Sequence, residues 1–280
     1  GSISWDIEEP VLDNVRILKV RPSGGRPASW IYRKIYSQFE MDWFYDFRNG
    51  FDGLLKEGDL DLVISSSPPE SAHLIALEIK NRLNVPWIAD LRDLWSDDHY
   101  RSFDIFRRTL FRRKEIDTLK KADAIVTVSE SWARGLRNRY GSRVSVVTNA
   151  YDPDYFSRIP IESGDRFAIT YLGKLNSAHQ DLSDFLGAVK KILDDGKIPA
   201  VKISVDFYTA GYGKPDISGL AASMGLSGIV KEHSPVPFGR ALELMKNSSL
   251  LLVAGWKGQS SPGWRPQKVY EYMGSGIPIM

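Results

Sequence analysis

Residues 61–95 read DLVISSSPPESAHLIALEIKNRLNVPWIADLRDLW, and this stretch decides the fold. It contains two short apolar runs, 61–65 and 85–89, on either side of an amphipathic segment at 71–82. Both runs are too continuously apolar to alternate, which is typical of strands buried on both faces of a parallel sheet. The apolar residues between them recur at helical spacing. The stretch therefore predicts a strand–helix–strand unit of the α/β class.

The same alternation continues along the chain. Two further strands are expected at 124–128 and 144–147, with a helix at 131–140 between them. A stretch rich in Pro, Asp and Ser, 149–166, reads as a linker, and the alternation then resumes. Beyond it the strands are expected at 167–172, 201–208, 229–230 and 250–254, and the helices at 182–193, 217–224, 238–246 and 266–273. Two α/β domains in series, 1–155 and 156–280, are the simplest account.

Composition narrows the class of protein. The chain has 280 residues, of which 42% are hydrophobic, so it can bury two moderate cores. Its formal charge of +2 gives no support for a nucleic-acid partner. The absence of cysteine excludes disulfides and thiolate metal sites, and no apolar run approaches the roughly eighteen residues of a membrane-spanning helix. We therefore expect a soluble, cytoplasmic protein.

The loops after the strands hold the candidate site residues, because ligands of open α/β sheets bind where parallel strands end. Gly173 and Lys174 follow the strand expected at 167–172. The glycine would let a ligand approach the backbone, and the lysine could place a charge beside a phosphate. For this loop alone, an ordinary turn with a solvated lysine is the favoured alternative. Gly211 follows another strand, but the third glycine of a dinucleotide fingerprint is missing, so a tight turn is expected there.

The segment RPQKVYEYMGSG, 265–276, predicts a helix with Pro266 in its first turn. Lys268 and Glu271 are three residues apart and share one face of this helix. A cation at the amino end of a helix is unfavourable unless an anion lies there, and Arg265 could help Lys268 to hold one. From spacing alone, a surface ion pair between Lys268 and Glu271 is an equally good interpretation.

A third candidate site follows the strand that ends near Asp90. Arg92 and Asp93 come directly after it. Carboxylates beside an arginine can orient the hydroxyls of a polar substrate. A purely structural pairing of arginine with aspartate is equally consistent with the sequence.

Four stretches in this order resemble one family. They are 61–95, quoted above, VSESWARGLRNRYGSRVSVVTNAYDPDYF at 128–156, ITYLGKL at 169–175 and KVYEYMGSGIPIM at 268–280. Together they look like successive landmarks of the retaining glycosyltransferases of family 4, which have the GT-B fold. The resemblance implies two Rossmann-like domains whose parallel sheets face each other across a cleft. It also implies a nucleotide-sugar donor that is held mainly by the second domain.

The resemblance assigns roles to the candidate residues. Lys174 and Lys268 would contact the donor diphosphate, and Glu271 would hold the ribose hydroxyls. Positive groups there would stabilise the charge that develops on the leaving diphosphate, so neither a metal nor another cofactor is expected. Asp59 and Asp61 precede a strand instead of ending one, and are not assigned to a metal. The predicted catalytic residues are Arg92, Asp93, Lys174 and Lys268, and the predicted donor-binding residues are Gly173, Lys174, Gly211, Gly263, Arg265, Lys268 and Glu271.

The chain departs from the family pattern at two positions and at its ends. The family often has a basic residue where His179 stands, and a glutamate where Gly263 stands. The first clear landmark begins near Asp61, and the sequence closes with the apolar run 277–280, which should form another strand. We therefore expect a fragment of a longer protein.

Two hypotheses for the function follow. The leading one is an enzyme that transfers a sugar, with retention, from a nucleotide-diphosphate sugar to a glycan or lipid-linked acceptor. The alternative is a catalytically inactive GT-B-like module that binds a nucleotide or saccharide, which the glycine at 263 favours.

Contact with a membrane is a separate question raised by the basic stretch 103–121. This stretch places Phe103, Phe106 and Leu110 near one face of a helix, and such a helix can lie on anionic lipid. A surface helix packed on its own domain is the favoured interpretation.

Overall fold

The computed structural model describes residues 44–45, 47–48, 50–51, 55–97, 105–162, 164–177, 179–209, 215–255 and 263–280. The chain forms two compact units, each with its own parallel sheet. Among the described residues, the first unit contains those between 44 and 148 together with 263–265, and the second contains those at 149–255 and 266–280. The domain boundary after residue 155 stays a prediction.

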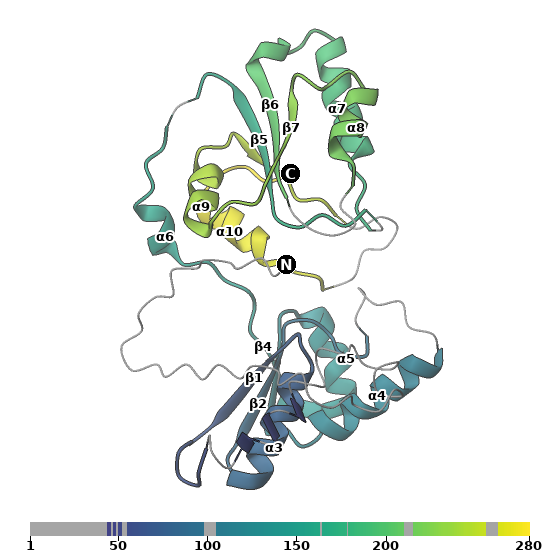
Figure 1. Ribbon diagram of the computed structural model, residues 1–280, viewed down its shortest axis with the longest axis vertical. Helices are drawn as coiled ribbons and strands as arrows, with labels where there is room; N and C mark the ends of the chain where they lie inside the picture. Colours follow the sequence, from purple (N-terminus) through teal and green to yellow (C-terminus); the bar gives the residue numbers. More distant parts are fainter. Residues whose placement is uncertain are drawn as a thin grey trace. The chain divides into compact units, whose positions relative to one another are not determined.

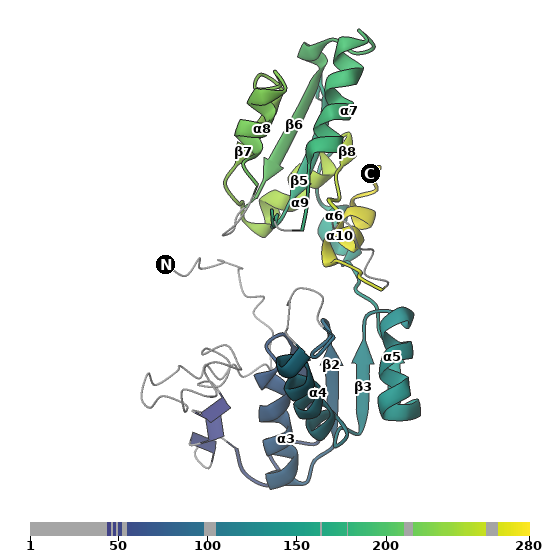
Figure 2. The same ribbon diagram turned by 90° about the vertical axis from the view of Figure 1, so that its right-hand side faces the viewer.

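The first unit is built on a sheet of four parallel strands. These are β1 (Val63–Ser67), β2 (Trp87–Leu91), β3 (Ala124–Thr127) and β4 (Val144–Val146), and they lie side by side in chain order. Alternate residues of β2 are fully buried, because period-two side chains place Trp87, Ala89 and Leu91 on one face. That face shares a hydrophobic core with the helices α3 (Ser71–Leu83), α4 (Ile105–Leu119) and α5 (Glu130–Tyr140), which can be followed in Figure 2.

The second unit also has four parallel strands, in the order β7-β6-β5-β8. They are β5 (Phe167–Leu172), β6 (Ile203–Tyr208), β7 (Val230–His233) and β8 (Leu250–Leu251). Figure 1 shows helices on both faces of this sheet. One hydrophobic core joins the sheet to α7 (Ser183–Asp194) and α8 (Ile217–Ser223). A second core joins it to α6 (Pro153–Ser157), α9 (Phe238–Lys246) and α10 (Gln267–Ser275).

The predicted α/β class is confirmed. Each expected strand and helix of the alternating pattern is present, most of them with shifted ends; the strand expected at 250–254, for example, is restricted to Leu250–Leu251. The linker prediction for 149–166 missed α6, whose amino end is capped by the Asp152 side chain and opened by Pro153. The run 277–280 lies parallel to β8 through a bridge between Ile279 and Leu251, as a further strand would.

None of the helices in the described part of the chain is long and apolar enough to cross a membrane.

Candidate functional site

The carboxyl end of β5 meets the amino end of α10, and this junction carries most of the predicted donor site. We call it the β5–α10 site and define it by Tyr171, Gly173, Lys174, Lys268 and Glu271. It lies at the edge where parallel α/β sheets bind ligands. All five residues belong to the second unit.

Helix α10 is fixed to β5 by a buried tyrosine. The Tyr272 side chain is fully buried, and its hydroxyl accepts a hydrogen bond from the Leu172 backbone N–H at 3.0 Å. The N–H would otherwise be buried without a partner, which is costly. This contact sets the position of the first turn of α10 relative to the end of β5.

The Lys268 ammonium lies against Tyr171 instead of pointing into solvent. Lys268 Nζ donates to the Tyr171 hydroxyl at 2.7 Å and lies 4.0 Å from the ring centroid. The Tyr171 hydroxyl in turn donates to the Lys174 carbonyl oxygen at 2.7 Å. A cation over an aromatic face is attracted by the ring, so this contact holds the ammonium at the strand end.

Gly173 leaves the space that Lys268 occupies. Its φ of +123° is a conformation that side chains rarely adopt. A Cβ atom built at this position would lie 2.9 Å from Lys268 Nζ. The backbone turn therefore favours glycine, and a larger residue would also push aside the flexible end of the Lys268 side chain. The sequence suggested only that a glycine here would let a ligand approach.

The two charged residues of α10 have shifted pKa values. Burial lowers the pKa of Lys268 to about 8, although the Glu271 carboxylate opposes the shift. Burial raises the pKa of Glu271, against the opposing effects of a Gln267 hydrogen bond and the Lys268 charge. The structure has no ion pair within 4 Å between these two described side chains, so the surface-pair alternative does not describe them. A half-buried ammonium of this kind is stabilised by a bound anion.

The loop after β5 is also fixed, although the Lys174 side chain is exposed. Buried Gln180 accepts from the Asn176 backbone N–H at 2.9 Å and donates to the Ala254 carbonyl at 2.8 Å. His179, which stands where the family often has a basic residue, is half-buried. The loop thus holds Lys174 at the rim of the β5–α10 site.

Gly263 and Arg265 lie in the first unit and not with Lys268 and Glu271. Gly263 is buried against the amino end of α5, with a φ of +105°. A Cβ atom there would come within 2.6 Å of both Ser129 Oγ and Trp132 Cδ1. Arg265 is exposed, and its guanidinium Nη1 donates to the Trp264 carbonyl at 3.0 Å. A glutamate side chain could not be accommodated at position 263 without movement of α5.

Arg92 makes structural contacts at the end of β2. Its guanidinium donates to the Val147 carbonyl at 3.3 Å and lies 3.7 Å from Asp90 Oδ1. Asp90 also accepts from the Ser66 hydroxyl at 3.0 Å. Asp93 is half-buried on the loop that follows. These contacts favour a structural pairing of Arg92 with Asp90, whereas Asp93 stays a candidate catalytic residue.

Gly211 lies outside the described residues. Among the residues that the structure describes, no three His, Asp or Glu side chains converge as metal ligands would. Asp59 accepts from the Lys56 backbone N–H at 2.7 Å in a turn before β1. The absence of a metal from the reaction stays a prediction.

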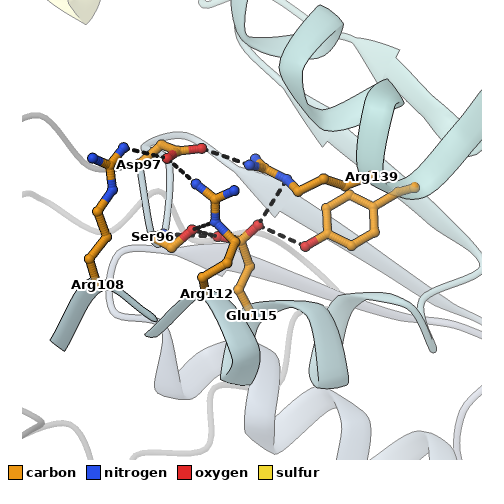
Figure 3. A network of polar contacts seen from close by, with 7 residues as sticks. Ser96, Asp97, Arg108, Arg112, Glu115 and Arg139 are labelled. Atoms are coloured by element: carbon orange, nitrogen blue, oxygen red, sulfur yellow. Dashed lines mark hydrogen bonds and ion pairs between the residues drawn. The ribbon is translucent and has the colours of Figure 1, made fainter. Parts of the chain in front are cut away.

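Sequence reasoning missed Tyr171 and a polar network around Glu115. Buried Glu115, on α4, accepts from the Ser96 backbone N–H at 2.9 Å and from the Tyr140 hydroxyl at 2.7 Å. Ser96 lies three residues after Asp93, so Glu115 fixes the loop that carries Asp93, a predicted catalytic residue. Figure 3 shows the network, which we call the Glu115 network; its members are Ser96, Asp97, Arg108, Arg112, Glu115, Arg139 and Tyr140.

Comparison with known proteins decides the family. The sequence pattern of Glycosyltransferase Family 4 matches residues 15–155, which is half of the chain. The chain belongs to Glycosyltransferase Family 4. A search of curated protein sequences finds no significant match.

Solved structures similar to this family 4 chain show that its fold is GT-B. Sucrose-phosphate synthase from Thermosynechococcus elongatus superposes with a TM-score of 0.61 at 13% identity, covering 85% of this chain and 60% of that one. A TarM variant from S. aureus, in complex with UDP and two saccharide ligands, gives 0.59 at 11% identity, with 85% and 44% covered. Trehalose 6-phosphate synthase from Burkholderia multivorans gives 0.62 at 11% identity, with 87% and 59% covered. The chain thus spans between 44% and 60% of the length of these proteins.

Proposed function

We propose that this family 4 chain binds the diphosphate of a nucleotide-sugar donor at the β5–α10 site and takes part in transfer of the sugar, with retention, to a glycan or lipid-linked acceptor. The observation that carries the proposal is the half-buried ammonium of Lys268. It donates to the Tyr171 hydroxyl and lies beside Gly173 at the end of β5. The TarM complex contains UDP, which supports a nucleotide as the ligand class.

The chemistry that the site can supply is electrostatic. Negative charge develops on the diphosphate as its bond to the sugar breaks, and a positioned cation stabilises it without a metal. Lys268 is held in place before the ligand binds, so little reorganisation is needed. The exposed Lys174 side chain would contribute a second charge from the rim, and Glu271 would accept hydrogen bonds from the ribose hydroxyls.

A thermal-shift screen of UDP, GDP, ADP and their sugars tests the proposal, because a ligand that binds only the folded chain raises its melting temperature. We expect one nucleotide to stabilise the chain in a saturable manner, and the Lys268→Ala variant to lose that response. A response that survives in the variant would contradict the assignment of the site.

A catalytically inactive binding module is the second candidate. The observation in its favour is Gly263, which stands where the family often has a glutamate and is packed too closely on α5 for a larger side chain. Such a module would bind the nucleotide but would neither hydrolyse nor transfer the sugar. Donor hydrolysis or transfer by the longest available form of the protein separates the two candidates.

Peripheral membrane contact by a cytoplasmic protein is also part of the proposal. Phe103 lies outside the described residues, and Leu110 is partly buried. The first turn of α4 nevertheless leaves Ile105 87% and Phe106 71% exposed. Exposed apolar side chains beside basic ones are typical of a helix that lies at a lipid surface.

A further inference from the structure

Three arginines converge on one carboxylate in the Glu115 network. The Asp97 Oδ1 atom accepts from Arg108 Nη2 at 3.2 Å and from Arg112 Nη2 at shorter range, and Oδ2 accepts from Arg139 Nη1 at 2.7 Å (Figure 3). Arg112 Nε also donates to the Ser96 hydroxyl at 2.7 Å. Arg108 and Arg112 are one turn apart on α4 and share the same carboxylate oxygen, so their guanidiniums lie close together.

The second carboxylate of the network does not balance these charges. Glu115 is buried, and its oxygens are already occupied by the Ser96 backbone N–H, the Ser96 hydroxyl and the Tyr140 hydroxyl. Arg139 Nε lies 3.5 Å from it. Among the residues that the structure describes here, three guanidiniums therefore face two carboxylates, an excess of one positive charge. Burial raises the pKa of Asp97, but the arginines, chiefly Arg139, outweigh this effect and keep Asp97 ionised at neutral pH.

Two of the three arginines of the cluster are partly exposed. The Arg108 side chain is 61% exposed and that of Arg112 is 33% exposed, whereas that of Arg139 is only 16% exposed. In the part of the chain that the structure describes, Nε and Nη1 of Arg108 and Nη1 of Arg112 have no protein acceptor. Guanidinium donors that are not already used by the protein match the oxygens of a phosphate group.

We propose that Arg108 and Arg112 form an anion subsite that binds a phosphate group carried by the acceptor. This inference rests on the proposed function, because it specifies the acceptor of the same reaction. Asp97 holds the two guanidiniums together in the absence of the ligand, and the phosphate adds the negative charge that the cluster lacks. The phosphate could belong to a soluble acceptor or to the headgroup of a lipid-linked one.

The first experiment uses inorganic phosphate as the probe. The melting temperature of the chain is followed as phosphate replaces chloride at constant ionic strength, in the wild type, Arg108→Gln and Arg113→Gln. Arg113 is an exposed arginine of the same helix outside the network, so its variant controls for net charge. We expect Arg108→Gln to weaken the apparent phosphate affinity about tenfold, as loss of a charge-assisted hydrogen bond implies, and Arg113→Gln to leave it unchanged. Equal effects of the two substitutions would overturn the proposal.

A second arm distinguishes the source of the phosphate. Co-sedimentation is measured with phosphatidylcholine vesicles that contain either phosphatidic acid or phosphatidylserine. Binding that prefers phosphatidic acid and is lost only in Arg108→Gln indicates a lipid headgroup. An Arg108-specific response to free phosphate without such vesicle binding indicates a soluble acceptor. Vesicle binding that falls equally in Arg108→Gln and Arg113→Gln, with no specific phosphate response, rejects the subsite.

The donor site serves as an independent readout. Nucleotide binding is measured on the same Arg108→Gln protein, and we expect it to match the wild type because Lys268 belongs to the other unit. Failure of the anion subsite is then separable from failure of the proposed function, which the Lys268→Ala variant tests.

Discussion

Gly173 and Lys268 are distant in sequence but depend on each other. The ammonium would lie 2.9 Å from a Cβ atom at position 173, and the turn itself has a φ of +123°. A methyl group added at position 173 would therefore strain the turn and displace the Lys268 ammonium. The first two predictions concern these residues.

Gly173→Ala should lower the free energy of unfolding by about 1–3 kcal/mol, because the residue would hold a rarely populated conformation and crowd Lys268. Chemical denaturation measures the change. Gly187→Ala is the matched control, since Gly187 lies in α7 with nothing within 4 Å of the added Cβ. That substitution should raise stability by about 0.5–1 kcal/mol. Two variants of equal stability would refute the close-approach argument.

The pKa of Lys268 predicts a pH dependence of stability. Burial lowers it to about 8 from an ordinary value of 10.5. Between these values the unfolded chain binds more protons than the folded chain, so the Lys268 contribution to the free energy of unfolding rises as pH rises from about 8 to 10.5. Below pH 8 this contribution is at its most unfavourable. The difference between wild type and Lys268→Met, measured by denaturation across this range, should show the rise, and a flat difference would count against the burial of the ammonium.

At the scale of elements, Glu115 joins three segments of the first unit. Glu115 lies on α4. Its carboxylate accepts hydrogen bonds from the Tyr140 hydroxyl on α5 and from the Ser96 backbone N–H in the loop after β2. Glu115→Ala would leave the Arg139 guanidinium and the Ser96 N–H without this partner. We expect a loss of about 3–5 kcal/mol in the free energy of unfolding.

Asp117→Ala is the control for this prediction, because Asp117 is an exposed residue of the same helix that pairs with the exposed Lys120. Its effect should stay within about 0.5 kcal/mol. If both variants unfold at the same denaturant concentration, Glu115 does not join the three segments.

The elements themselves were largely predictable from the sequence. Buried parallel strands are continuous apolar runs, so β5 was placed at 167–172 from its pattern alone. Helix α6 was missed because PDYFS has only five residues, although Asp152 before Pro153 is a recognisable amino-terminal signal. Short irregular elements carry too few residues for a period to show.

The candidate site was predictable only in part. The pattern and the family resemblance brought Gly173, Lys268 and Glu271 to one site. The structure places Lys268 against Gly173, whereas the role of these residues in binding a donor stays a prediction. The contact between Lys268 and Tyr171 spans 97 residues of sequence, and no local pattern reports which strand residue a helix side chain will meet. Glu115 escaped notice for the same reason, since its partners come from three separate segments.

At the scale of the whole molecule, two α/β units share one architecture but carry different charged sites. The second unit holds the β5–α10 site, and the first holds the Glu115 network with its surplus of arginine. This division matches a reaction with two substrates, of which one is a nucleotide and the other carries a phosphate.

Turnover separates an enzyme from a silent binding module. We expect the protein to hydrolyse its donor slowly and to transfer the sugar when an acceptor is added, because the chain belongs to Glycosyltransferase Family 4. Release of the nucleoside diphosphate reports both reactions. Tight nucleotide binding with no release above the uncatalysed rate would instead support the binding module.

The central claim is that Lys268 holds a diphosphate. Calorimetric titration of the chain with UDP, GDP and ADP measures this directly in the wild type, Lys268→Ala and Lys191→Ala, where Lys191 is an exposed lysine of α7. For the nucleotide that binds, we predict an affinity about 10- to 100-fold lower in Lys268→Ala and unchanged in Lys191→Ala, as loss of one charged hydrogen bond implies. Wild-type affinity in the Lys268→Ala variant would contradict the account.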